Sequence, residues 1–289
     1  MDSGLSTIFE STEPEVLGTG FTFTEGPLWD PGFGGYYFVD IPKHLLYRLK
    51  PGDKPEVVRE NTGMGNGTTF DLDGRILMCQ GAHRRVARLL PDGGTEVLAD
   101  RFEGRRFNRP NDVICRSDGS IYFTDLGTSL PLAEWEMPFR GVYRVDLSGT
   151  VSLVAHCERP NGLAFSPDER VLYVANTGFT QYINAFELDG GGRVVRRRIF
   201  ADMSSDEREG VPDGMKVDVE GRVYCTGAGG VWVFAPDGSR IGILPTAEVI
   251  ANLAFGGADM RTLFLTSSTS VLALRTRTPG IVHPRFRGQ

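Results

Sequence analysis

The sequence predicts an all-β fold, a six-bladed β-propeller with a metal site in its central channel. A unit of about four strand-like segments recurs at a period of roughly 40 to 50 residues, which is typical of propeller blades. The first segment of every unit also begins with an oxygen-bearing side chain at or beside its first position. Because the units follow one another without interruption, we expect one domain over residues 1–289.

Each unit has the internal pattern of a blade. In unit four the strand-like segments are residues 162–165, 171–175, 183–188 and 194–200. Asp-Gly or Pro-Asp turns follow the first segment of this unit, and similar turns occur at 73–74, 118–119 and 220–221. The segments are short and continuously apolar, as strands buried on both faces are.

The oxygen-bearing residues at the unit starts share one register in five of the six units. They are Glu25, Asn66, Asn111, Asn161 and Asp213, and in the sixth unit Asn252 stands one place later. In a propeller the first strand of every blade lines the channel, so these side chains should converge on one axis. Carboxylate and amide oxygens are the ligands that a hard cation such as Ca²⁺ prefers.

A purely structural interpretation of this register is that Asn and Asp before Gly form the turns that lead into the strands. That interpretation accounts for Asn66 and Asn161. It accounts poorly for Glu25, since Glu is a weak turn former, and it does not predict oxygen donors in all five units.

Composition and motifs exclude several classes of protein. The formal net charge of −6 argues against a nucleic-acid partner. The chain has no run of 18 apolar residues and no basic-then-apolar leader, so we expect no membrane partner and a cytoplasmic location. The four cysteines occur singly and are interpreted as buried thiols, and no serine-hydrolase elbow, Walker loop or zinc-protease motif is present.

Two features near the predicted channel mouth have alternative interpretations. His83 follows the second strand of unit two, where it either contacts substrate or makes a structural hydrogen bond. Residues 126–140 form an insertion in unit three that contains several apolar side chains. This insertion either covers the mouth as a lid or packs on the neighbouring blade.

Five segments together resemble the SMP-30/gluconolactonase/luciferin-regenerating family: residues 24–29, 108–112, 159–168, 211–215 and 252–257. The resemblance covers most of the chain and implies a six-bladed propeller with one divalent cation, in a family of which many members hydrolyse sugar lactones. It implies Glu25, Asn161 and Asp213 as metal ligands, Asn111 as a further ligand or a substrate contact, and Arg109 as a substrate contact. Asn66 matches the register without being a firm ligand position, and we expect it beside the ligands or against the substrate.

We therefore expect a metal-dependent carboxylic ester hydrolase, a gluconolactonase-like lactonase that opens a sugar lactone to the aldonic acid. One divalent cation, Ca²⁺ ahead of Zn²⁺, Mn²⁺, Mg²⁺ or Fe²⁺, would polarise the carbonyl, with Asp213 as general base. The expected partner is a small lactone, and the protein a monomer or homodimer. The alternatives are a hydrolase of organophosphates or aromatic lactones, and a non-catalytic ligand-binding propeller.

Overall fold

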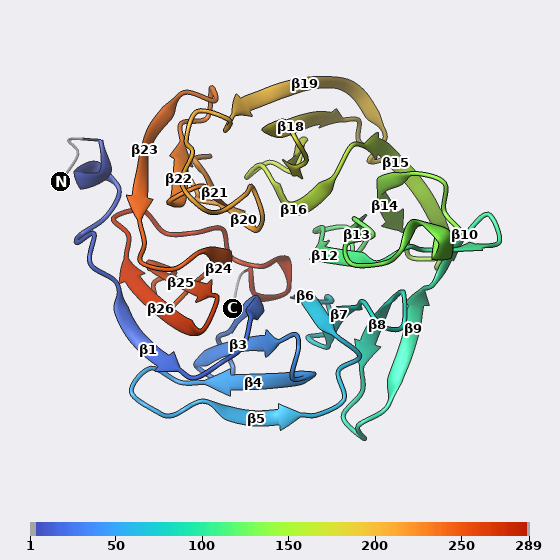
Figure 1. The fold of residues 1–289 in the computed structure, drawn as a ribbon, viewed down its shortest axis with the longest axis horizontal. Helices are drawn as coiled ribbons and strands as arrows, with labels where there is room; N and C mark the ends of the chain where they lie inside the picture. The colour runs from blue at the N-terminus through green and yellow to red at the C-terminus, as the bar shows by residue number, and fades with distance from the viewer. Residues whose placement is uncertain (1–3, 288–289) are drawn as a thin grey trace.

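Six four-stranded antiparallel sheets stand around a common axis in the computed structural model, which describes residues 4–287 (Figure 1). The innermost strand of each sheet contacts the innermost strands of its neighbours around the ring. This arrangement confirms the predicted fold class, a six-bladed β-propeller.

The blades follow chain order. Blade 1 contains β2 (Thr24–Asp30), β3 (Gly35–Asp40), β4 (Leu45–Leu49) and β5 (Glu56–Arg59). Blade 2 contains β6 (Gly65–Phe70), β7 (Ile76–Gln80), β8 (Arg85–Leu89) and β9 (Thr95–Ala99). Blade 3 contains β12 (Pro110–Cys115), β13 (Ile121–Asp125), β14 (Arg140–Val145) and β15 (Val151–Cys157).

Blade 4 contains β16 (Pro160–Phe165), β17 (Val171–Thr177), β18 (Gln181–Leu188) and β19 (Val194–Asp202). Blade 5 contains β20 (Met215–Val217), β21 (Val223–Gly227), β22 (Gly230–Phe234) and β23 (Arg240–Pro245). Blade 6 contains β24 (Ile250–Gly256), β25 (Thr262–Ser267), β26 (Ser270–Arg275) and, as its outer strand, β1 (Glu15–Thr19). A short hairpin, β10 (Arg101–Phe102) and β11 (Arg105–Arg106), and three 3₁₀ helices, η1 (Leu5–Thr7), η2 (Leu132–Glu134) and η3 (Pro284–Phe286), complete the described elements.

The ring is closed by a strand from the beginning of the chain. Strand β1 pairs antiparallel with β26, with Glu15 opposite Ala273 and Thr19 opposite Ser270. The repeat pattern did not predict this pairing, because residues 15–19 lie outside the six units. The hydrogen bonds of this sheet hold the two ends of the ring together without a covalent link.

The core lies between neighbouring blades, which pack face to face. Tyr36 of blade 1 stacks on Phe264 of blade 6, with ring centroids 4.2 Å apart, and Phe38 packs beside them. All five residues of β21 and of β22 are buried. Burial on both faces explains why these strands appear in the sequence as continuous apolar runs.

The chain after β26 crosses one end of the central channel. The backbone N–H of Ile281 donates to the Val217 carbonyl, and the Phe286 ring packs edge-on against Phe70. Arg287 then forms an ion pair with Glu169, with nitrogen and oxygen 3.3 Å apart. We call this end of the channel the base, and the opposite end, where the innermost strands begin, the mouth.

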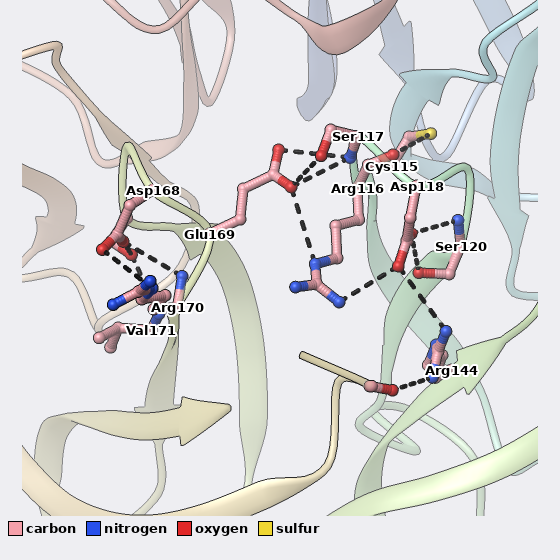
Figure 2. A network of polar contacts seen from close by, with 12 residues as sticks. Cys115, Arg116, Ser117, Asp118, Ser120, Arg144, Asp168, Glu169, Arg170 and Val171 are labelled. Carbon is pink, nitrogen blue, oxygen red and sulfur yellow. Dashed lines mark hydrogen bonds and ion pairs between the residues drawn. The ribbon is translucent and has the colours of Figure 1, made fainter. Parts of the chain in front are cut away.

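Glu169 also joins blades 3 and 4 at the base. It accepts hydrogen bonds from the backbone N–H and the hydroxyl of Ser117, and it lies 3.7 Å from the Arg116 guanidinium (Figure 2). Arg116 in turn pairs with Asp118 at 3.2 Å. Glu169 and Arg116 are largely buried while Ser117 and Asp118 are exposed, and the network joins the turns of the two blades.

Among residues 4–287, the helices are all single 3₁₀ turns, so none could span a membrane. The four cysteines are free thiols, and Cys79, Cys115 and Cys225 are buried as expected. Cys157 is partly buried.

Candidate functional site

A cavity of about 430 Å³ lies at the channel mouth. All five residues of the shared register line it, and Arg109 lines it with them: Glu25, Asn66, Asn111, Asn161, Asp213 and Arg109. These residues come from five different blades. The structure thus brings to one cavity the residues that the repeat aligned.

A repeated β-bulge helps to place these side chains. In each of blades 1 to 4, the pairing of the innermost strand with its neighbour shifts register close to the oxygen-bearing residue: between Glu25 and Leu28, Gly65 and Thr68, Pro110 and Val113, and Pro160 and Leu163. A bulge leaves residues out of the ladder and redirects their side chains. The bulges leave Asn66, Asn111 and Asn161 out of the ladder, whereas Glu25 stays paired with Val39 and the bulge follows it.

Glycine follows the register position in four blades because neighbouring innermost strands approach closely there. A Cβ on Gly26 would lie 2.2 Å from the Asn66 carbonyl oxygen, and one on Gly162 would lie 2.2 Å from the Asp213 carbonyl oxygen. Gly67 and Gly214 are equally confined, by Asp112 and Asn252. Crowding around the axis therefore explains the Asn-Gly and Asp-Gly pairs better than turn formation does.

In the two remaining blades, 3 and 6, the glycine position carries Asp112 and Asn252. Both side chains are buried, at 4% and 2% exposure. The Asn252 amide donates to Glu25 Oε2 at 2.9 Å, and it also hydrogen-bonds to Asp112. These two residues form a layer directly beneath the register residues. The sequence analysis missed Asp112, although an acid at a position that is otherwise glycine was a visible signal.

Burial and mutual repulsion disfavour the charged form of the carboxylates at this site. Burial, reinforced by the charge of Asp112, raises the pKa of Glu25 to about 7. Burial and the charge of Glu25 raise the pKa of Asp213 well above its usual value. The Lys216 ammonium opposes this effect at Glu25 and Asp112 from below.

The donor set fits a divalent cation. Asn66 Oδ1, Asn161 Oδ1 and Asp112 Oδ2 are buried and accept no hydrogen bond from any residue in the described range 4–287. Buried acceptors are normally satisfied, so such atoms beside two repelling carboxylates are suited to bind a cation. Within the same range no three His, Cys, Asp or Glu side chains form a group that could hold a metal, so amide oxygens would have to complete the ligand set.

Two arginines line the same cavity, and only one of them was predicted. Arg109 donates from Nη1 to the Thr128 carbonyl at 2.9 Å, while its Nε is buried without a partner among the described residues. Arg159 occupies the matching position in blade 4. The signal for Arg159 was present, since Arg-Pro-Asn occurs at both 109–111 and 159–161.

His83 lies apart from this group. It is exposed in the turn between β7 and β8, and it is not among the residues that line the cavity. Its ring packs over Gly63, and its carbonyl accepts a hydrogen bond from Arg106. That His83 contacts substrate therefore stays a prediction, and the residue does not line the cavity.

The insertion at 126–140 borders the mouth and contacts the neighbouring blade 2, where Arg84 donates to the Glu134 carbonyl, while a function as a lid stays a prediction. Leu126, Thr128 and Ser129 line the cavity wall. Met137 is buried and hydrogen-bonds through its backbone to the Asn108 side chain in both directions. Leu132, at the tip, is 74% exposed. The insertion thus walls one side of the mouth and is anchored to its own blade.

Comparison with known proteins agrees with the fold and identifies the family. A family model described as SMP-30/Gluconolactonase/LRE-like region matches residues 23–269. The gluconolactonase of Zymomonas mobilis subsp. mobilis is 30% identical over 93% of this chain and 83% of its own length. The solved structure of a gluconolactonase from Xanthomonas campestris has a TM-score of 0.89 and 31% identity, covering 96% of this chain and 93% of that one.

A more distant structure shares the fold. Regucalcin from Agrobacterium tumefaciens str. C58, described as a calcium-binding protein, has a TM-score of 0.77 at 21% identity and covers 97% of each chain. The family match extends from blade 1 into blade 6, and the resemblance found in the sequence is confirmed. The chain belongs to the SMP-30/gluconolactonase/LRE-like family.

Proposed function

We propose that this protein is a divalent-metal-dependent lactonase that opens a sugar lactone to the aldonic acid. The observation that carries the proposal is the convergence of two carboxylates, three amides and two arginines on one cavity. A scaffold without chemistry has no need for two buried carboxylates that repel each other. The gluconolactonases among its relatives support a sugar lactone as the substrate class.

Glu25, Asn161 and Asp213 would hold the cation, and Asn111 would be a fourth ligand or a substrate contact. An all-oxygen set that mixes carboxylates with neutral amides suits Ca²⁺ best. The calcium-binding description of the Agrobacterium relative supports the same choice. When bound, the cation would polarise the lactone carbonyl and stabilise the oxyanion formed on it.

Asp213 is the better candidate for general base of the two carboxylates. Glu25 Oε2 already accepts from the Gly26 N–H at 2.6 Å and from Asn252, whereas Asp213 has Asn161 as its side-chain partner. Asp213 takes a proton from the water whose oxygen bonds to the carbonyl carbon. The ring carbon–oxygen bond breaks, and a proton returns to the ring oxygen to give the hydroxy acid.

Arg109, Asn111 and Asn66 would position the sugar. The Arg109 guanidinium and the amides line the same cavity and can bond several hydroxyl groups at once. Orientation of this kind converts binding energy into rate, because the carbonyl is held against the base.

The experiment that tests the proposal removes bound metal with a chelator and follows opening of glucono-1,5-lactone. We expect activity to disappear and to return on addition of one of Ca²⁺, Zn²⁺, Mn²⁺, Mg²⁺ or Fe²⁺. An aryl phosphotriester and dihydrocoumarin, an aromatic lactone, serve as competing substrates. Turnover of either of these without turnover of any sugar lactone would contradict the substrate class, and no turnover by the metal-loaded protein would contradict the enzyme.

A further inference from the structure

We infer that the preferred lactone carries an anionic substituent, a carboxylate, phosphate or sulfonate, and that Arg159 and Arg109 recognise it together. This inference rests on the proposed function and names the substrate class of the same site. It starts from the two guanidiniums that border the cavity.

The two arginines are equivalent in the fold. Each stands immediately before the proline that begins a bulged innermost strand, Pro110 in β12 and Pro160 in β16. Blades 3 and 4 are neighbours in the ring, and their innermost strands are in contact. The arginines therefore border adjacent sides of the mouth, each two residues before the register asparagine of its blade, Asn111 or Asn161.

Neither guanidinium is neutralised. No carboxylate in residues 4–287 lies within 4.0 Å of Arg109 or Arg159, and no hydrogen bond of the Arg159 side chain is found in that range. The negative charge of Glu134 stabilises the charged form of Arg109 only from beyond ion-pair distance, and the positive charge of Arg84 destabilises that form.

A third arginine nearby is occupied elsewhere. Arg140 donates to the carbonyls of Leu126 and Glu158 and lies over the Trp135 ring. Burial, together with the charge of Arg159, lowers the pKa of Arg140. Arg140 therefore adds to the positive electrostatic potential around Arg159. An anion that enters the mouth meets donors that no protein carboxylate has satisfied.

The charged side chains that line the cavity predict the charge of the substrate group that the two arginines bind. The only lining carboxylates of the cavity among the described residues are Glu25 and Asp213, and a divalent cation would balance both. In the layer below, Lys216 offsets Asp112. The two arginines then leave the mouth with an excess of two positive charges. A neutral sugar offers them only hydroxyl groups, whereas an oxyanion offers charge-assisted and bidentate hydrogen bonds.

The test compares lactones that differ in charge. The metal-loaded protein is assayed with glucono-1,5-lactone, 6-phosphoglucono-1,5-lactone and glucaro-1,4-lactone, so that the phosphate and carboxylate arms are separate. We expect kcat/KM at least about tenfold higher for one of the anionic lactones than for the neutral one. This preference should shrink as salt concentration rises.

Variants at Arg159 locate the effect. Arg159→Gln should lower kcat/KM for the anionic lactone by about 10- to 100-fold, mainly through KM, and should lower that for the neutral lactone far less. Arg159→Lys should recover part of the loss. The matched control is Arg170→Gln, which removes one positive charge from the same blade at the base, where the side chain is 82% exposed. The control should keep the wild-type preference.

Binding gives a readout without turnover. Calorimetry with 6-phosphogluconate and gluconate should show tighter binding of the phosphorylated acid to the wild type, and the difference should vanish in Arg159→Gln. Equal kcat/KM for neutral and anionic lactones, or equal losses for both in Arg159→Gln, would overturn the inference while leaving the lactonase intact. If no lactone is opened, the proposed function fails, and the calorimetry alone decides whether Arg159 binds an anion.

Discussion

The two ends of the central channel are built from the same innermost strands, yet they differ completely in chemistry. At the mouth, the strands begin with carboxylates and amides around a cavity of about 430 Å³. At the base, the same strands end around a second cavity of about 350 Å³ that is mainly apolar, with Leu28, Leu163 and Phe255 in its wall. The position of a residue along each innermost strand thus decides whether its side chain lines the polar cavity at the mouth or the apolar cavity at the base.

The two ends also differ in access. The C-terminal segment at 281–287 contributes Ile281, His283, Phe286 and Arg287 to the wall of the base cavity and covers that end (Figure 1). The mouth is bordered by loops, among them the insertion of blade 3. A substrate should therefore enter at the mouth, and changes at the base should affect stability rather than turnover.

The largest expected effect is at the mouth. Asp213→Asn keeps the size of the side chain and one oxygen donor but removes the proton acceptor, so turnover of a sugar lactone should fall by at least about a hundredfold. Metal content and kcat are measured on the same sample. Near-normal turnover in a metal-loaded variant would show that another group takes the proton.

At the base, acid should weaken the fold through His283. Burial between Phe70 and Phe286, together with the positive charge of Arg287, lowers the pKa of this histidine to about 4, although Asp71 opposes the shift. The unfolded chain takes up this proton near pH 6.5 and the folded chain only near pH 4. Stability is therefore complete above pH 6.5 and is lost as the pH falls from 6.5 to 4, by up to about 3 kcal/mol.

Urea unfolding of wild type and His283→Gln at pH 7 and pH 4 isolates this contribution. The pH-dependent loss should be smaller in the variant. His156→Gln, a change at an exposed histidine on β15, should behave as wild type does. Equal pH dependence in His283→Gln and wild type would show that the base cavity does not exclude the proton.

The sequence predicted the mouth better than the base, for physical reasons. The register of Glu25, Asn161 and Asp213 could be aligned because local strand and turn patterns repeat, and the structure places all three at one cavity. Asp112 was visible only as an acid at a position that is glycine in four other blades, and its role depends on how closely neighbouring strands approach, which single-strand patterns do not report. The closure of the ring by β1 and of the base by the C-terminal segment depends on contacts between distant parts of the chain, for which no periodicity exists.

A moderate effect at the mouth concerns Arg109. Its guanidinium can hold two oxygens of a polar lactone but offers little to an apolar ring. Arg109→Ala should lower kcat/KM for polyhydroxylated lactones by roughly 1.5 to 3 kcal/mol and leave metal binding intact. An apolar lactone should lose much less, and equal losses for both substrates would make Arg109 a structural residue.

The smallest expected effect is at the base again. The ion pair of Arg287 with Glu169 is partly exposed, with 40% of the arginine side chain accessible, so Arg287→Gln should cost less than about 1 kcal/mol of unfolding free energy. Lactone turnover should not change. A clear loss of turnover in this variant would break the separation between the two ends.

The central claim, that the oxygen donors at the mouth form a metal site, is tested most directly by calorimetric titration of the chelator-treated protein with Ca²⁺. We expect one ion per chain, and in Glu25→Gln an affinity weaker by at least about tenfold, or about 1.4 kcal/mol. If neither Ca²⁺ nor any other divalent cation binds, or if Glu25→Gln binds as tightly as wild type, then the converging oxygens do not form a metal site.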